Sequence, residues 1–161
     1  MSQIHSNSPA EAGAVPAIPA DIAEWLGAVR LTQLTAVAAG SIPVVSSSDC
    51  PDADSSAHHL ALLRVFTYGL ARGVADSEEL ERRAQQEPAL RHLCGSTAPT
   101  AVVLRNFRRR YSGEIESALA RVLGACWEGC EEHAQLATVL TREARSRVRE
   151  SVRADSLAQD N

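Results

Sequence analysis

The sequence LLRVFTYGLARGVADSEELERRAQQEPALRHLCG occupies residues 62–95, and PTAVVLRNFRRRY follows at residues 99–111. Apolar residues recur in both segments at intervals of three and four, which is the spacing of amphipathic helices. Gly73 and Gly95 each follow such a run and are expected to end a helix, and Pro88 suits the first turn of a short helix between them. These segments therefore predict helices joined by tight turns.

Polar residues indicate where the helices begin. Ser55 or Ser56 precedes the first helix, and Asp76 can cap the second with Glu79 at the capping-box position. Thr100 can cap a later helix that continues to Tyr111. The core-facing residues expected on the first helix are Leu60, Leu63, Phe66, Thr67 and Leu70.

Upstream, the chain divides into three parts. Residues 1–18 are rich in Ser, Ala, Pro and Gly and lack periodicity, so they predict a disordered tail. Residues 19–40 predict one helix from Asp21 to about Ala39, and residues 41–56 predict a linker because turn residues occur throughout. The apolar stripe expected on the N-terminal helix consists of Ile22, Trp25, Leu26, Val29 and Val37.

Downstream, the spacing predicts one long helix from Glu114 to about Val152. We assign residues 57–135 to the main helical domain and residues 136–161 to a C-terminal helical extension with a polar tail. This extension has few apolar residues and would be marginal alone, so it either pairs with another chain or frays. The stripe expected along the long helix consists of Ile115, Leu119, Val122, Cys126, Cys130, Leu136, Leu140, Ala144 and Val148.

The composition favours an all-α fold. Hydrophobic residues make up 45% of the 161 residues, but only two Phe, two Tyr and two Trp are among them. A core of Ala, Leu and Val suits closely packed helices better than a β-sandwich, in which β-branched and aromatic residues would dominate. We predict a small helical bundle with a helix-turn-helix-like segment and a long C-terminal helix.

Charge is distributed unevenly along the chain. All 16 basic residues are Arg, and the net charge is −4. Residues 64–110 nevertheless hold nine Arg against five acids, a local excess of +4, whereas the segments on either side are acidic. The charge of the whole chain argues against nucleic-acid binding, but that of this segment permits it. Its cations are planar guanidiniums, which suit phosphate and guanine.

Residues 62–123 resemble the InsH-type N-terminal domain of bacterial insertion-sequence (DDE) transposases. The similarity lies in an ordered series: an apolar helix that ends near a glycine, a Ser-containing helix with a Leu-Glu pair, a short helix ending in Leu-Cys-Gly, and a Pro-led helix with Phe-Arg. The matching residues are Tyr68, Gly69, Gly73, Ser77, Leu80, Glu81, Pro88, Leu90, Arg91, Leu93, Gly95, Pro99, Phe107, Arg108 and Tyr111. The resemblance implies a DNA-recognition domain, which in that family precedes an RNase H-like catalytic domain.

The chain departs from the family in two respects. The family commonly has Asp or another small polar residue where this chain has Thr100, and a Thr-Ile pair near Val103 and Leu104. The catalytic domain of the family uses a carboxylate triad that holds two metal ions, whereas the acids after Tyr111 lie on one predicted helix and cannot converge. We therefore expect no catalytic residues, no enzymatic activity and no cofactor.

Five arginines are candidate DNA contacts. Arg105, Arg108 and Arg109 lie at i, i+3 and i+4 of one predicted helix and are expected to project together from its outer face. Arg82 and Arg83 of an earlier helix could extend this surface, in a helix-turn-helix-like arrangement that reaches phosphates or guanine edges. The residues expected to face the core instead are Val103, Leu104, Phe107 and Tyr111, with Arg110 near the core edge.

A second interpretation of these arginines remains open. They form a solvated face whose charges are balanced by Glu78, Glu79 and Glu81. Spacing alone does not separate a solvated face from a DNA contact, and the family resemblance is what favours DNA.

Two groups of residues suggest metal binding but do not predict it. Cys126, Cys130 and His133 lie at i, i+4 and i+7, yet a straight helix would spread them over roughly 10 Å, and no fourth zinc ligand is evident. Buried thiols are the preferred interpretation. The linker acids Asp49, Asp52 and Asp54 lack the glycine and glutamate that complete a calcium loop, so they predict a solvated turn.

The sequence leaves three functional hypotheses. The first is a non-catalytic, transposase-derived DNA-binding domain that recognises insertion-element ends. The second is a protein-interaction module that forms a homodimer or binds a transposase subunit through the C-terminal helix, and the third is a remnant without function. Because residues 1–20 lack a basic signal-peptide region and no apolar run approaches about 20 residues, we expect a cytoplasmic protein without membrane contact.

Overall fold

The computed structural model describes residues 17–43, 53–95, 97–127 and 133–159, and these residues form seven helices and no strand. The predicted all-α fold is confirmed. No helix in these ranges combines the length and apolarity needed to cross a bilayer. The helices are α1 (Ile22–Leu26), α2 (Ala28–Gly40), α3 (Ala53–Ala71), α4 (Ser77–Gln86), α5 (Pro88–Cys94), α6 (Ala101–Cys126) and α7 (His133–Gln159).

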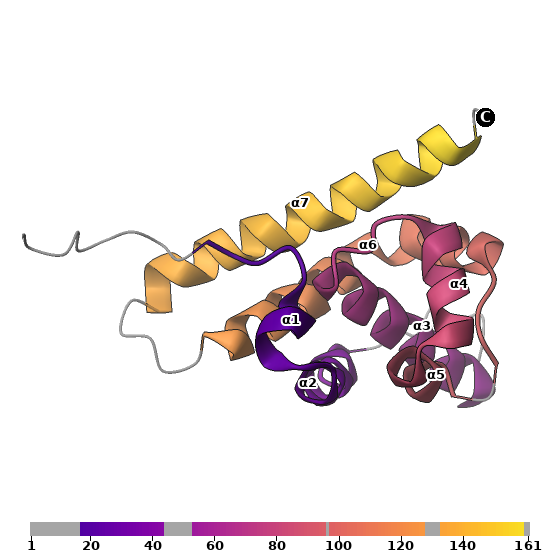
Figure 1. Cartoon of the computed structure of the whole chain (residues 1–161), viewed down its shortest axis with the longest axis horizontal. Helices are drawn as coiled ribbons and strands as arrows, with labels where there is room; N and C mark the ends of the chain where they lie inside the picture. The colour runs from indigo at the N-terminus through magenta and orange to yellow at the C-terminus, as the bar shows by residue number, and fades with distance from the viewer. Residues whose placement is uncertain (1–16, 44–52, 96, 128–132, 160–161) are drawn as a thin grey trace, which may run out of the picture.

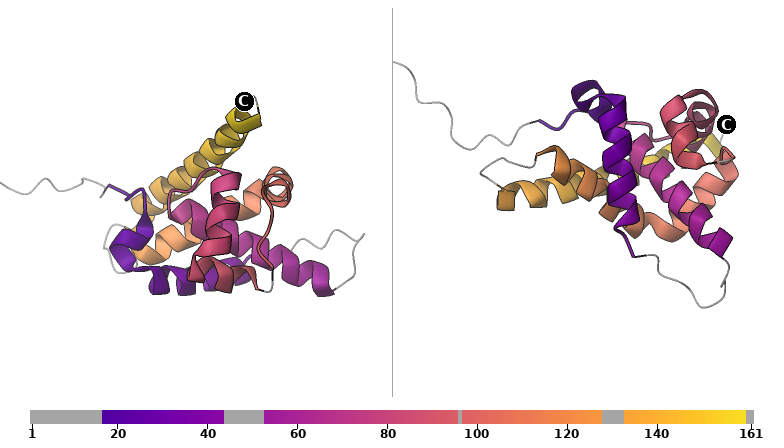
Figure 2. Two further views of the ribbon diagram at one scale, coloured as in Figure 1. Left: turned by 45° about the vertical axis from the view of Figure 1, so that its right-hand side comes forward. Right: turned by 90° about the horizontal axis from the view of Figure 1, so that it is seen from below.

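The helices are stacked around α3 and α6. α6 contacts α7, α3, α2 and α4, and α3 contacts α2 and α5 as well. α7 lies across one side of the molecule with α6 beneath it, whereas α2 and α5 lie on the side farthest from α7 (Figures 1 and 2). α6 is therefore covered by other helices on more than one of its faces.

The turn signals in the central segment are confirmed. Gly73 and Gly95 follow helices with φ of 71° and 77°, a backbone region that favours glycine. Asp76 caps α4 by accepting a hydrogen bond of 2.8 Å from the backbone N–H of Glu79, and the Thr100 hydroxyl accepts one from Val103 at the start of α6. α3 begins at Ala53, earlier than expected.

The single helix expected from Asp21 to Ala39 is wrong, because it breaks at Gly27. Asp21 caps α1 as predicted, but Gly27 adopts φ 83° and ψ 147°, which ends α1 and starts α2 in a new orientation. The predicted apolar stripe is correspondingly lost, since Trp25, Val29 and Val37 are 51%, 75% and 72% exposed. The residues that α2 buries instead are Leu31, Thr35, Ala38 and Ala39.

The long helix expected from Glu114 to Val152 is also wrong. α6 runs from Ala101 to Cys126 with only a kink at Tyr111 (φ −122°, ψ 27°). After Trp127 the chain reverses, and α7 packs back against α6. Ile115, Leu119 and Val122 of the predicted stripe are buried on α6, and Leu136, Leu140, Ala144 and Val148 are buried on α7. The two helices face each other, because folding back hides both apolar faces within one chain.

The hydrophobic core is continuous through parts of the chain that the sequence suggested were separate. It includes Ile22 of α1, Leu119 of α6 and Leu140 of α7, and Ile18, which we expected in a disordered tail, packs against it. α3 and α4 approach closely at Gly69, where an added Cβ would lie 2.6 Å from the Leu80 Cδ1 atom. Residues 1–16 of the predicted tail and residues 44–52 of the linker lie outside the described residues.

Candidate nucleic-acid interface

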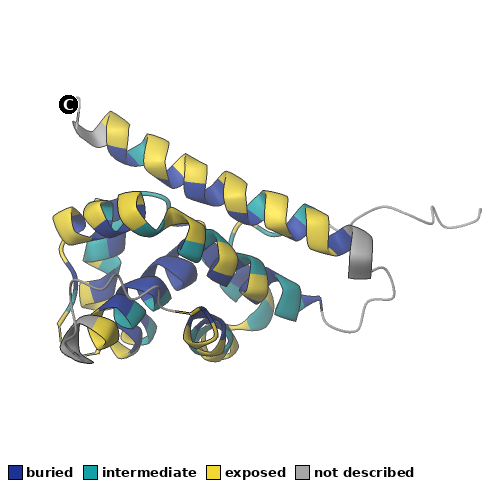
Figure 3. Cartoon of the chain, turned by 180° about the vertical axis from the view of Figure 1, so that it is seen from behind, coloured by how far each residue is buried: buried dark blue, intermediate teal, exposed yellow. Residues whose placement is uncertain are grey.

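Buried polar contacts fix the orientation of α7. The Arg147 guanidinium donates hydrogen bonds to the carbonyl oxygens of Ala20 and Leu70, both at 3.0 Å, and of Pro19 at 2.6 Å. Near the end of the helix, the Asp155 carboxylate accepts bonds from the backbone N–H and hydroxyl of Ser77, at 3.0 and 2.8 Å. These contacts hold one face of α7 against the molecule and leave the opposite face exposed (Figure 3).

Arg108, predicted as a DNA contact, does not lie on an outer surface, so the expectation that it projects outward with Arg105 and Arg109 is wrong. Its exposed fraction is 2%, and it forms an ion pair with Asp155 of α7. Its guanidinium also lies 5.8 Å from the centre of the Phe66 ring. Burial lowers the pKa of Arg108 to about 10. α7 covers α6 at Arg108, where the helical spacing predicted solvent, and this explains the error.

The neighbouring arginines of α6 do not form the shared outer surface that was predicted. Arg105 is partly buried, and its guanidinium lies 3.5 Å from the Glu78 carboxylate. Arg109 is exposed. Arg110 is also exposed rather than at the core edge, with its guanidinium 5.5 Å from the centre of the Tyr111 ring. Val103, expected in the core, is 37% exposed.

Arg82 and Arg83 are brought together by α4, but a carboxylate lies between them. Glu79 accepts hydrogen bonds from both guanidiniums, at 2.6–2.7 Å, and Arg83 also contacts Glu87. The hydrogen bonds from Arg82 and Arg83 lower the pKa of Glu79 to about 2. This pairing matches the interpretation of a charge-balanced, solvated face better than that of a DNA-contacting one.

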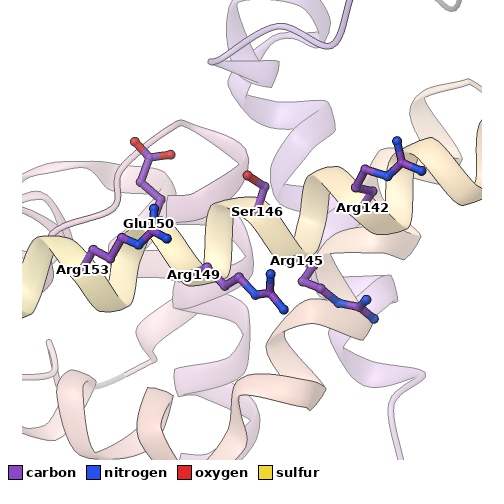
Figure 4. Close-up of a pocket in the computed structure, with 6 residues that line it drawn as sticks. All are labelled: Arg142, Arg145, Ser146, Arg149, Glu150 and Arg153. Carbon is purple, nitrogen blue, oxygen red and sulfur yellow. The ribbon is translucent and has the colours of Figure 1, made fainter.

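A different basic surface lies on the exposed face of α7. We call Arg142, Arg145, Arg149 and Arg153 the arginine row; they follow one another at i, i+3, i+7 and i+11 and therefore share one side of the helix. Ser146 and Glu150 lie beside them on the outer surface of α7 (Figure 4). Arg142, Arg149 and Arg153 form no hydrogen bond or ion pair with any other residue that the structure describes.

The arginine row borders a groove between α6 and α7, which has a volume of about 390 Å³. On the α6 side, the groove is lined by Ser112 and Glu116. Arg109 lies three residues before Ser112 on the same helix. The groove also contains apolar surface from α7, including Val152, which is 43% exposed. Its complete lining is Ser112, Glu116, Arg145, Val148, Arg149, Val152 and Arg153.

The acids near the arginine row differ in whether they pair with an arginine of that row. Glu116 of α6 accepts a hydrogen bond of 2.9 Å from Arg145 across the groove. Glu143 is occupied by Arg147, which donates to it at 2.7 Å. Glu150 is exposed and projects from α7 away from Arg145 and Arg149 (Figure 4). Arg145 is thus the only member of the row with a carboxylate partner among the described residues.

The proposed stripe of Cys126, Cys130 and His133 does not lie on one helix. Cys126 ends α6 and His133 begins α7, with Cys130 outside the described residues. The described part of the chain contains no cluster of three His, Cys, Asp or Glu side chains placed to bind a metal ion. Cys126 is partly buried, and its thiol donates to the carbonyl oxygen of Val122 at 3.1 Å.

The sequence analysis missed the arginine row because it treated the C-terminal extension, which contains TREARSRVRESVR, as marginal alone, so that it would either pair with another chain or fray. The signal was present, since arginines at i, i+3, i+7 and i+11 of a helix form a one-sided cationic surface. It becomes interpretable only when α7 is known to dock through Val148, Ser151 and Asp155, which lie on the opposite side.

Most of the residues on which the expected family resemblance rests are buried. Tyr68, Leu80 and Phe107 are buried, as are Leu90, Leu93 and Arg108, and Glu81 accepts a 2.6 Å hydrogen bond from the Ala101 N–H at the start of α6. The positions named here contribute to packing and to the start of α6. Comparisons of this protein with protein-family models, with curated proteins and with solved structures found no match.

Proposed function

We propose that this protein is a non-catalytic DNA-binding domain that holds duplex DNA through the arginine row of α7 and Arg109 of α6. The observation that carries the proposal is the unpaired state of Arg142, Arg149 and Arg153 within the described chain. Guanidiniums that already face a carboxylate gain little from a phosphate, whereas unpaired ones gain charge-assisted hydrogen bonds.

The geometry of α7 supports this proposal. The helix has 27 residues, and its outer face is exposed along its length (Figure 3). The arginine row covers 11 residues of rise, or roughly 16 Å, which is long enough to contact several phosphates of one duplex. Buried contacts at Arg147 and Asp155 keep the helix backbone in place, so binding has to order only the arginine side chains.

The resemblance to transposase N-terminal domains supports the same ligand by a separate route. It favours the ends of an insertion element as the physiological DNA. The contacts proposed here differ from those that the resemblance suggested, because Arg108 is buried and Arg82 and Arg83 are paired.

The experiment is fluorescence anisotropy with a labelled mixed-sequence duplex at low and moderate salt. The test variant is Arg142/Arg149/Arg153→Ala. Its matched control is Arg30/Arg82/Arg91→Ala, which removes the same charge from three exposed positions on α2, α4 and α5. Circular dichroism and thermal unfolding check that both variants are folded.

We expect the wild type and the control to bind and the test variant to lose at least tenfold in affinity. Four neutralised phosphates give a log–log salt slope of about −3.6. Equal losses in the two variants would mean that binding follows net charge and not the arginine row. No binding by the wild type at low salt would refute the function.

The alternative function, association through the C-terminal helix, loses the surface on which it was based. Leu136, Leu140, Ala144 and Val148 of α7 are buried in the core of the same chain. The exposed face of α7 is cationic, and two copies of it would repel each other. The geometry therefore favours an anionic ligand over a second copy at this helix.

A further inference from the structure

We propose that the phosphate backbone of one DNA strand lies in the α6–α7 groove, on the Glu116 side of the arginine row, and that Glu116 competes with this backbone for Arg145. The inference rests on the proposed DNA-binding function and specifies where on the surface the ligand lies. It also proposes that the Glu116 carboxylate lowers the affinity for DNA, which the proposed function alone does not require.

The shape of the arginine row favours one side of α7. At 100° per residue, Arg142, Arg149 and Arg153 lie within about 20° of one line, and Arg145 lies about 60° to one side of it. Glu150 lies about 80° to the other side. A polyanion centred over the row meets Arg145 if it shifts toward α6 and Glu150 if it shifts away, so the electrostatic attraction directs it into the groove.

The groove offers groups that suit a sugar–phosphate chain. Arg149 and Arg153 supply cations at its edge, and the exposed Ser112 can donate a hydrogen bond to a phosphate oxygen. Val148 and Val152 form the apolar part, which suits the carbon atoms of deoxyribose. No aromatic side chain lines the groove. Since single strands are usually held by bases stacked on aromatic rings, the lining favours a strand that remains part of a duplex.

Glu116 occupies the position that a phosphate would take at Arg145. Its carboxylate is 22% exposed and 2.9 Å from the Arg145 Nε atom. A phosphate that enters the groove must replace this carboxylate or bind beside it against charge repulsion. Removing the negative charge of Glu116 therefore frees one cation for DNA and removes one repulsive contact.

The test compares Glu116→Gln with Glu150→Gln by anisotropy on a 16-base-pair mixed-sequence duplex and on its single strand. The two variants change net charge equally, and both replace a side chain on the border of the arginine row. We expect Glu116→Gln to tighten duplex binding about three- to tenfold and to steepen the salt slope by about 0.9, the value for one more phosphate. Glu150→Gln is expected to change affinity less than twofold.

The outcomes separate this inference from the function on which it rests. Equal effects of the two substitutions, or a larger effect of Glu150→Gln, would place the strand elsewhere, while loss of binding in the Arg142/Arg149/Arg153→Ala variant would still support the function. Tighter binding of the single strand than of the duplex would contradict the ligand assigned to the groove. If the wild type binds neither, both the function and the groove assignment fail.

A second substitution tests the groove without removing the Glu116–Arg145 pair. Ser112→Asp places a carboxylate in the groove at an exposed position, so the fold should tolerate it. We expect duplex affinity to fall about tenfold, whereas Ser117→Asp, which is exposed on α6 outside the groove, should cost less than threefold. Similar losses in both would refute the groove as the binding position.

Discussion

Asp155 of α7 and Arg108 of α6 form an ion pair in the interior of the protein, with exposed fractions of 4% and 2%. The same carboxylate accepts both hydrogen bonds from Ser77, so three helices meet at one buried acid. Burial lowers the pKa of Arg108 to about 10, and Arg108 is therefore still charged at neutral pH. The pair thus compensates a charge that would otherwise be buried alone.

Removing the acid should be more damaging than removing the pair. Asp155→Ala leaves the Arg108 charge and both Ser77 donors without a partner, and we expect it to lower the free energy of unfolding by about 3–5 kcal/mol in urea titrations at pH 7. The double variant Arg108→Met/Asp155→Leu should recover much of this loss. Arg109→Ala, exposed on the same helix, should change stability by less than about 0.5 kcal/mol. A small effect of Asp155→Ala would contradict the importance of the pair.

Arg147 should not tolerate a conservative change. Its guanidinium bonds to carbonyl oxygens of Pro19, Ala20 and Leu70, and the three donors of a Lys ammonium cannot reproduce this fork. We expect Arg147→Lys to cost about 2–3 kcal/mol by urea unfolding. Arg145→Lys, two residues away on the exposed face, should cost less than about 0.5 kcal/mol. Equal costs would show that the carbonyl contacts contribute little.

Replacing the glycine before α2 and the glycine at its end should have opposite effects on stability. Gly27 has φ 83° and ψ 147°, where any side chain is strained, so Gly27→Ala should destabilise the protein by about 1–3 kcal/mol. Gly40 ends α2 without a positive φ, and an added Cβ meets no atom within 4 Å. Gly40→Ala should be neutral or stabilising by up to about 1 kcal/mol. Thermal unfolding of both variants would detect a reversal of this order.

Glu79 should contribute a pH-dependent part of the stability. Hydrogen bonds from Arg82 and Arg83 lower its pKa from 4.5 to about 2 in the folded protein. Because the folded state binds this proton less readily than the unfolded state, the contribution is complete above about pH 4.5 and is lost as the pH falls through about 2. The difference in thermal midpoint between wild type and Glu79→Gln should therefore shrink over this range. A difference independent of pH would show that the two guanidiniums do not act on this carboxylate.

The described thiols should react slowly. Burial raises the pKa of Cys94 and of Cys126 from 9.0 to about 11, which lowers the thiolate fraction about a hundredfold near pH 8. In a Cys50/Cys130→Ser variant, labelling by a chromogenic disulfide reagent should be at least about a hundredfold slower in buffer than in concentrated urea. Rapid labelling without denaturant would indicate that α5 or the end of α6 opens readily.

The parts of the fold that follow from neighbouring residues could be predicted from the sequence. α5 begins and ends where Pro88 and Gly95 indicate, and Asp76 caps α4 through Glu79. These signals act over three or four residues, so no knowledge of the rest of the molecule is needed. Gly27 gives a weaker signal, because a glycine within an apolar run either breaks a helix or is tolerated in it, and only φ distinguishes the two.

The candidate site could not be predicted, because it depends on which helices cover which faces. Arg108 was predicted to be exposed because it was grouped with Arg105 and Arg109, yet it lies only about 40° around the helix from the buried Leu104. α6 is covered by α3 on one side and by α7 on another. Its burial is acceptable only because Asp155, far along the chain, lies against it. Because α7 docks on α6, the segment from Arg142 to Arg153, which was expected either to pair with another chain or to fray, becomes a fixed cationic surface.

The contacts of Arg147 also have a consequence for how the protein is made. Its carbonyl partners at Pro19 and Ala20 lie 128 and 127 residues upstream, so a ribosome must synthesise nearly all of the described chain before these bonds can form. Until α7 emerges, the side of α6 that it covers remains an apolar surface open to chaperones or to other nascent chains. Because the arginine row is carried by this same late helix, a truncated translation product lacking α7 cannot compete with the complete protein for an anionic ligand at that surface.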